Sequence, residues 1–113
     1  MRRFVVVPIL LLGASFGYTQ TRSFAGEIMD SQCAAMRTHS RMMAGVEAKD
    51  AKECTQKCVH MGGKYALYEP ASQTAYQLDD QQKAAGFAGH KVSVKGTLNT
   101  GSRTIHVEQM NAQ

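Results

Sequence analysis

The sequence predicts a small domain, between all-β and α+β, in which five short strands form a barrel and two helices are inserted after the first strand. Three observations carry this prediction. Five short segments alternate between apolar and polar residues, two longer segments have helical signals, and the mature chain of about 95 residues has room for one domain. Five short strands in a flat sheet of this size would leave exposed edges, and closing the sheet removes them.

The strands are expected where apolar and polar side chains alternate along the chain. They cover residues 22–29, 65–69, 74–78, 91–98 and 103–110. In the fourth strand, for example, Val92 and Val94 point to one face and Lys95 points to the other. A short helix is expected within 79–87, between the third and fourth strands, which is where an OB-fold carries its helix. The sequence therefore predicts an OB-like barrel.

The insertion after the first strand is expected to hold two helices, within about residues 31–62. Asp30 gives an N-cap signal for the first helix, and good helix formers follow over 32–43. The second helix begins after Asp50, in a capping-box arrangement. It ends at the glycine pair 62–63.

The N-terminus is typical of a cleaved signal peptide covering residues 1–17, with the cleavage point between 17 and 21. Two arginines follow Met1, an uncharged and mostly apolar stretch covers 4–16, and small residues come next. The apolar stretch is shorter than the roughly 20 residues that a membrane-spanning helix needs. We therefore expect an exported protein, periplasmic or secreted, whose mature part is one domain over 22–113.

The charge pattern gives little support to nucleic acid as a partner. The chain has 13 basic and 9 acidic residues, a net charge of +4, and losing Arg2 and Arg3 with the signal leaves 11 basic residues, or +2. These charges are interspersed and form no run. We expect no nucleic-acid partner and no membrane contact after cleavage. The charge pattern leaves two kinds of partner as alternatives, an envelope protein and a small ligand.

The three cysteines, Cys33, Cys54 and Cys58, are an odd number for an exported domain. In an oxidising compartment the expected state is one disulfide and one free thiol, because a small core gains from a covalent staple. The bond is expected between Cys33 and either Cys54 or Cys58, closing a loop of about 21 or 25 residues, and either bond would stabilise by roughly 3 kcal/mol. A bond between Cys54 and Cys58 would span one turn of helix and fits disulfide geometry poorly.

The three cysteines are also candidate ligands of a metal ion. Cys54 and Cys58 share one face of the second helix, and Cys33 would complete a three-thiolate set of the kind that zinc binds. A histidine would be the fourth ligand. His39 lies six residues after Cys33, and on a regular helix it points away from that cysteine. His60 lies two residues after Cys58 and points away as well. This site requires that one of the segments is not helical, and we favour the disulfide.

A second candidate metal site uses methionine sulfur. Met36, His39 and Met43 fall at i, i+3 and i+7 on the first predicted helix, and thioether and imidazole groups suit copper(I). Methionine is also a common filler of irregular core gaps, and we favour that role here. No cofactor is expected, with zinc or copper as the alternative.

No catalytic constellation stands out. Asp79 and Asp80 are adjacent and do not converge on one point, so they indicate a helix cap. The Cys-x-x-x-Cys spacing differs from the Cys-x-x-Cys of thioredoxin-like proteins, and no Cys-x-x-Cys-His haem motif occurs. We predict a disulfide-stapled, non-enzymatic binding or structural module. The alternative is a periplasmic zinc- or copper-binding protein, and a thiol redox protein is the less favoured third.

Several runs of residues form a pattern of their own. FAGEIMDSQC covers 24–33, ECTQKC covers 53–58, and FAGHKVSVKGTL covers 87–98. Through the paired motifs Asp-Ser-x-Cys and Cys-x-x-x-Cys above all, the chain resembles a family of small exported bacterial proteins of unknown function that is common in acidobacteria. The resemblance covers nearly all of the mature chain. It implies an OB-like fold and export, and it implies no reaction and no catalytic residue.

Overall fold

The computed structural model describes residues 20–113, and the predicted signal peptide over 1–17 lies outside them. The described chain forms five strands and four helices in an α+β fold. They are β1 (Arg22–Asp30), α1 (Ser31–Met36), α2 (Ser40–Gly45), α3 (Ala51–His60), β2 (Tyr65–Glu69), β3 (Thr74–Leu78), α4 (Gln81–Ala85), β4 (Lys91–Asn99) and β5 (Thr104–Ala112). All five strands are confirmed to within two residues of their predicted bounds, and the helices expected after Asp50 and within 79–87 are confirmed as α3 and α4.

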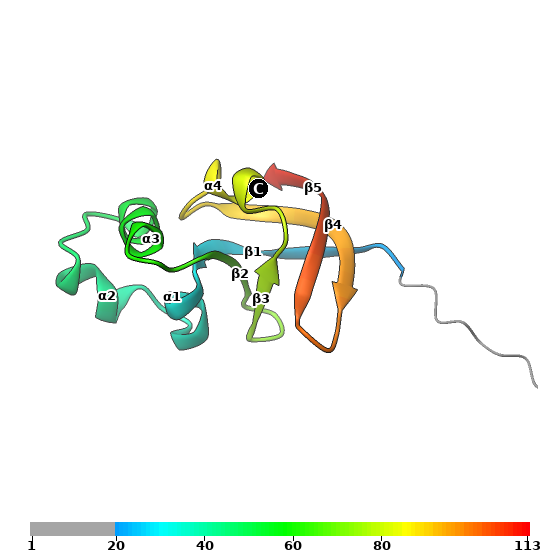
Figure 1. The fold of residues 1–113 in the computed structure, drawn as a ribbon, viewed down its shortest axis with the longest axis horizontal. Helices are drawn as coiled ribbons and strands as arrows, with labels where there is room; N and C mark the ends of the chain where they lie inside the picture. The colour runs from blue at the N-terminus through cyan, green and yellow to red at the C-terminus, as the bar shows by residue number, and fades with distance from the viewer. Residues whose placement is uncertain (1–19) are drawn as a thin grey trace, which may run out of the picture.

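The five strands form one mixed sheet that closes on itself (Figure 1). The order around this ring is β1-β2-β3-β5-β4, and only β3 and β5 run parallel. β1 pairs with two neighbouring strands of the ring. Its first part pairs with β4 and its last part pairs with β2. Glu27 lies where the two pairings overlap, opposite Lys91 of β4 and Tyr68 of β2. β1 then leads the chain out of the ring and into the helices.

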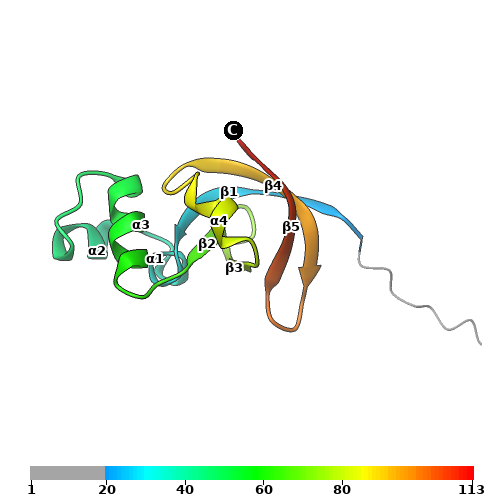
Figure 2. The ribbon, with the colours of Figure 1, turned by 45° about the horizontal axis from the view of Figure 1, so that its top comes forward.

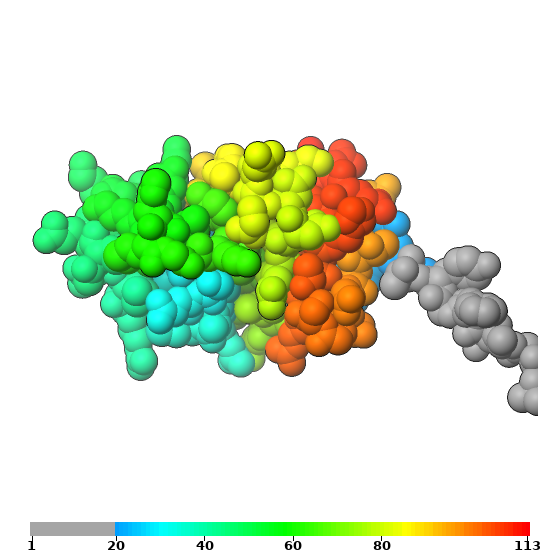
Figure 3. All heavy atoms as spheres, in the orientation of Figure 1, coloured from blue at the N-terminus to red at the C-terminus, as the bar shows by residue number. Residues whose placement is uncertain are grey.

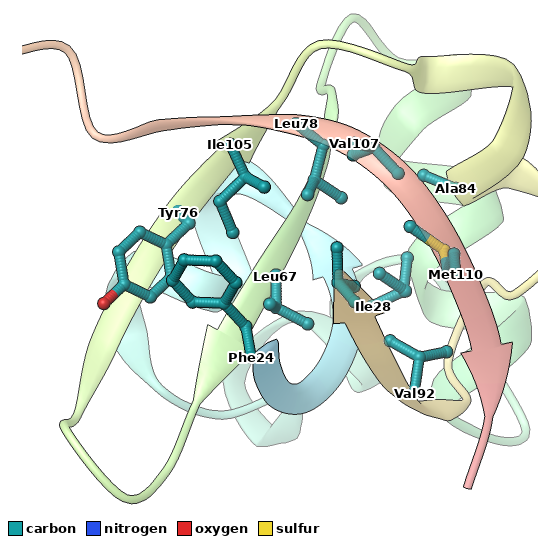
Figure 4. Packing of buried hydrophobic residues seen from close by; sticks show 11 residues of the cluster. Phe24, Ile28, Leu67, Tyr76, Leu78, Ala84, Val92, Ile105, Val107 and Met110 are labelled. Atoms are coloured by element: carbon teal, nitrogen blue, oxygen red, sulfur yellow. The ribbon is translucent and has the colours of Figure 1, made fainter. Parts of the chain in front are cut away.

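The interior of the ring is filled by side chains from all five strands (Figure 4). Phe24 and Tyr76 meet edge to face, with their ring centroids 5.2 Å apart. Ala84 brings α4 against the same core. The alternation predicted for the fourth strand is confirmed, since Val92 and Val94 are fully buried. Removal of this apolar surface from water is the main force that holds the ring together.

The ring closes at its shortest pairing, where β3 meets β5 at only two positions. Asp79 follows β3 directly and extends this contact. Its carboxylate accepts a hydrogen bond of 2.9 Å from the backbone N–H of Val107 and lies 2.6 Å from Nδ1 of His106. Asp80 caps α4 by accepting a hydrogen bond from the N–H of Lys83, as its sequence position predicts.

The single helix predicted over 32–43 is wrong, because this segment forms two short helices. α1 ends at Met36, and Arg37 takes the left-handed conformation with φ of 61°. The hydroxyl of Thr38 then accepts a hydrogen bond from the N–H of Ser40, which gives the backbone a local alternative to the helix. Helix propensity over this segment is a weak tendency, and such local bonds and tertiary packing override it.

The three helices of the insertion gather at one end of the ring, whereas α4 lies apart from them, near β5 (Figures 1 and 2). In the space-filling view the helical end and the ring form one continuous body (Figure 3). A second apolar cluster lies between them, and its buried members are Met29, Cys33, Ala34, Cys54, Cys58 and Ala66. No helix within the described residues is long and apolar enough to cross a membrane.

Candidate metal centre

All three cysteines lie in the buried apolar cluster between the helices of the insertion and the ring. Cys33 comes from α1, and Cys54 and Cys58 lie one turn apart on α3. Cys33 and Cys54 are fully buried, while Cys58 is 5% exposed. The structure holds all three as free thiols. The disulfide expected between Cys33 and either Cys54 or Cys58 stays a prediction.

The break between α1 and α2 turns His39 back toward these cysteines. A ring nitrogen of His39 and the Sγ atoms of Cys33 and Cys54 all lie within 4.8 Å of one another. The expectation that His39 points away from Cys33 is therefore wrong. It assumed a regular helix, and the left-handed Arg37 interrupts that helix.

The two ring nitrogens of His39 have different surroundings. Nε2 lies 3.0 Å from Oε1 of Glu27 on β1. Nδ1 is buried and is the one buried side-chain nitrogen or oxygen within residues 20–113 that has no hydrogen-bond partner. When Nε2–H donates to Glu27, the lone pair of Nδ1 is left free to bind a metal. Histidine ligands in metal sites are commonly oriented by a carboxylate in this way.

Asp30 lies on another side of the cluster. Its carboxylate caps α1 by accepting hydrogen bonds from the backbone N–H groups of Gln32, at 3.0 Å, and Cys33, at 3.2 Å. One of its oxygens and the Sγ atoms of Cys33 and Cys58 all lie within 4.8 Å of one another. Cys33 therefore belongs to two sets of three neighbouring ligand atoms.

The surroundings of Cys33 and Cys58 favour the neutral thiol. Burial, followed by the neighbouring Asp30, raises the pKa of Cys33. Burial, the charge of Asp30 and the nearby Cys54 raise the pKa of Cys58 to about 11. Reactive cysteines need a lowered pKa, because the thiolate is the nucleophile. Cys33 and Cys58 therefore lack the lowered pKa of a reactive thiol, and a metal ion can displace such protons as it binds.

The four side chains Cys33, His39, Cys54 and Cys58 fit the ligand set of a tetrahedral zinc site. Three cysteines and one histidine are a common set for zinc, with metal–ligand distances of about 2.0–2.3 Å. Such distances place the ligand atoms about 3.3–3.8 Å apart. The ligand atoms of Cys33, His39 and Cys54 lie within 4.8 Å of one another, so these three would move by about 1 Å or less to reach that geometry. Cys58 lies within 4.8 Å of Cys33 in the other set and would have to move toward His39 and Cys54 to become the fourth ligand.

The other predicted ligands lie elsewhere. Met36 is on α1 and Met43 is on α2, on opposite sides of the break at Arg37, so they do not share one helical face with His39. Met42 and Met43 are partly buried and pack against the cysteine-bearing cluster, in the gap-filling role that we favour for them. His60 ends α3 and belongs to neither set of three ligand atoms that the described residues form.

Sequence reasoning did not find Glu27 as a partner of the site. The alternation of β1 predicts that its side chain points away from the barrel interior, but nothing in the local sequence predicts that His39, twelve residues later, returns to meet it. In comparisons with known proteins, no family model, no curated protein and no solved structure matches the chain significantly. The proposals below therefore depend on the geometry of this chain.

Proposed function

We propose that this protein is a metal-binding module that holds one zinc ion through Cys33, His39, Cys54 and Cys58. The observation that carries the proposal is the state of His39. Its Nδ1 is buried without a partner, its Nε2 is bonded to Glu27, and one of its ring nitrogens lies within 4.8 Å of the Sγ atoms of two buried cysteines. An unsatisfied buried polar atom costs about 1–3 kcal/mol. A metal ion bound to Nδ1 removes this cost.

A metal accounts for more of the cluster than a disulfide does. A disulfide would join two of the three thiols and leave Nδ1 of His39 unsatisfied, whereas a metal ion would use all four side chains. Zinc suits a mixed set of sulfur and nitrogen ligands in tetrahedral arrangement. Copper(I) is drawn to thiolate and thioether sulfur, and we place Met42 and Met43 in packing roles.

We further propose that the module is an exported, OB-like barrel that acts by binding rather than catalysis. The strand order β1-β2-β3-β5-β4, the parallel pairing of β3 with β5, and the place of α4 between β3 and β4 support the OB-like assignment. In an oxidising compartment, a bound metal would also protect the thiols from disulfide formation. The free energy of metal binding would add to the stability of a small core.

Metal analysis of the full chain, purified without chelators, tests the proposal. We expect one zinc per chain and three thiols that react after denaturation and metal removal. His39→Ala should weaken zinc binding at least about tenfold, measured by competition with a chromophoric chelator, because one ligand of four is lost. His60→Ala is the matched control and should leave the affinity unchanged, because His60 belongs to neither ligand set.

Three results would contradict the proposal. A metal-free chain with one free thiol and one disulfide would support the disulfide-stapled module instead. Stoichiometric copper in place of zinc would overturn the assignment of the metal. An unchanged affinity in His39→Ala would remove the histidine from the site.

A further inference from the structure

A surface cleft reaches the cysteine cluster at Cys58. Cys58 lines this cleft together with Asp30 and the turn that follows α3, where Met61 is 66% exposed. Neither Cys54 nor His39 lines it. Gly63 helps to keep it open, because a Cβ at this position would come within 3.0 Å of the Cys58 carbonyl oxygen and 3.5 Å of Oδ2 of Asp30. The cluster thus has an outer side at the cleft and an inner side away from it.

The two sets of ligand atoms match these two sides. The outer set, Asp30, Cys33 and Cys58, includes two residues that line the cleft, Asp30 and Cys58. The inner set, Cys33, His39 and Cys54, has two cysteines with no exposed surface. Cys33 belongs to both sets, so a metal held at one set can reach the other without losing all its protein ligands.

We propose that a divalent metal ion enters the zinc site in two steps, first binding the outer set at the cleft and then passing to the inner set; this inference rests on the proposed metal-binding function. In the first step the ion binds Asp30, Cys33 and Cys58, and the two thiols release their protons to water. In the second step the bond to Asp30 breaks as bonds to Cys54 and Nδ1 of His39 form. Cys54 releases the third proton, and no electrons are transferred.

Asp30 suits a temporary role. Its oxygens are already engaged as the helix cap, accepting backbone N–H bonds from Gln32 and Cys33, which holds the carboxylate in place at the cleft. A carboxylate attracts a cation and can bind it through a remaining lone pair. Thiolate and imidazole are the ligands that zinc takes in its closed tetrahedral sites, so the ion is held more firmly once it leaves Asp30. The site would then exchange its metal through the cleft.

Stopped-flow absorbance with cobalt(II) and the metal-free full chain tests the two steps, because cobalt bound to thiolate absorbs strongly. We expect a first phase whose rate rises with cobalt concentration and a second phase whose rate does not. Asp30→Asn keeps a residue that caps helices. It should remove the first phase and slow uptake by about tenfold, the scale seen when partners of metal sites are lost. The equilibrium affinity should fall less than the uptake rate.

Asp50→Asn is the matched control, since Asp50 caps α3 through the N–H of Glu53 and does not line the cleft. It should leave both phases unchanged. A second pair of variants tests the path without replacing a ligand. Gly63→Ala narrows the cleft and should slow uptake and release together, whereas Gly45→Ala, which has open space around the added methyl, should slow neither.

The outcomes separate the two proposals. A wild-type chain that binds no cobalt overturns both the metal site and the two-step route. A wild-type chain that binds cobalt in one phase, or an Asp30→Asn variant with both phases intact, overturns the route alone. If Asp30→Asn lowers the uptake rate and the equilibrium affinity for cobalt by the same factor, Asp30 is a permanent ligand. That result would also overturn the route.

Discussion

At the scale of single residues, the proposed metal site depends on the pair formed by Glu27 and His39. Glu27 is held on β1, where its backbone pairs with strands on both sides, so its carboxylate has a well-defined position. The side chain of His39 is 11% exposed and that of Glu27 is 23% exposed, so water competes little for their contact. In the proposed site Glu27 is therefore a positioning residue, which holds the ring of His39 through Nε2.

Replacing Glu27 should weaken metal binding without removing a ligand. We expect Glu27→Ala to lower zinc affinity by about 10–100-fold, because the ring of His39 loses its orientation and its preferred tautomer. Glu27→Gln keeps an acceptor oxygen and should recover most of the affinity, which a purely packing role would not explain. Glu108→Ala, on an exposed position of β5, is the control. Competition titrations measure all four proteins, and equal affinities would contradict this role.

At the scale of elements, His39 lies beside the cysteines because α1 and α2 are separate helices. Arg37 ends α1 in the left-handed region, at φ of 61°, and its N–H bonds back to the carbonyl of Ala34. α1 is anchored by its Asp30 cap and by the buried side chains of Cys33 and Ala34. The turn that follows brings His39 to the thiols, which a straight helix would not do.

The left-handed position of Arg37 predicts opposite effects for two substitutions. Arg37→Gly should raise the free energy of unfolding by about 0.5–1 kcal/mol, because glycine adopts this conformation without strain. Arg37→Val should lower it by about 1–3 kcal/mol, because a β-branched residue is strained there. Chemical denaturation of the metal-free chain measures both changes. A valine variant as stable as the wild type would show that the turn does not depend on this conformation.

At the scale of the whole molecule, the ring is closed by the contact between β3 and β5 and by Asp79 beside it. Partial burial opposes ionisation of Asp79, but the hydrogen bond from Val107 N–H and the contact with His106 outweigh it and hold the pKa of Asp79 below its usual value. A carboxyl group with a lowered folded-state pKa stabilises the fold above its unfolded pKa, near 3.9. That stabilisation is lost as the pH falls through the folded pKa.

The closure of the ring should therefore depend on pH through Asp79. We expect Asp79→Asn to be less stable than the wild type near neutral pH, and the difference to shrink below about pH 4 and to vanish well below it. Urea unfolding of both proteins over a series of pH values measures this difference. A difference that stays constant with pH would show that the charge of Asp79 does not contribute.

Most of the fold follows from local sequence patterns. Alternation locates all five strands, and the capping residues Asp30, Asp50 and Asp80 locate the starts of three helices, because these signals act between residues that are neighbours in the chain. The helix break at Arg37 is not predicted, because arginine is a good helix former and its left-handed conformation depends on the packing around it.

The sequence by itself determined the strands, most of the helix caps and the three cysteines as the candidate sulfur ligands. Only the tertiary structure decided that His39 joins the cysteines, that Glu27 bonds to it and that Asp30 and Cys58 lie together at a cleft. The physical reason is that these contacts join separate elements. Their geometry depends on how the helices pack on the ring, and residue spacing along one helix does not contain that information.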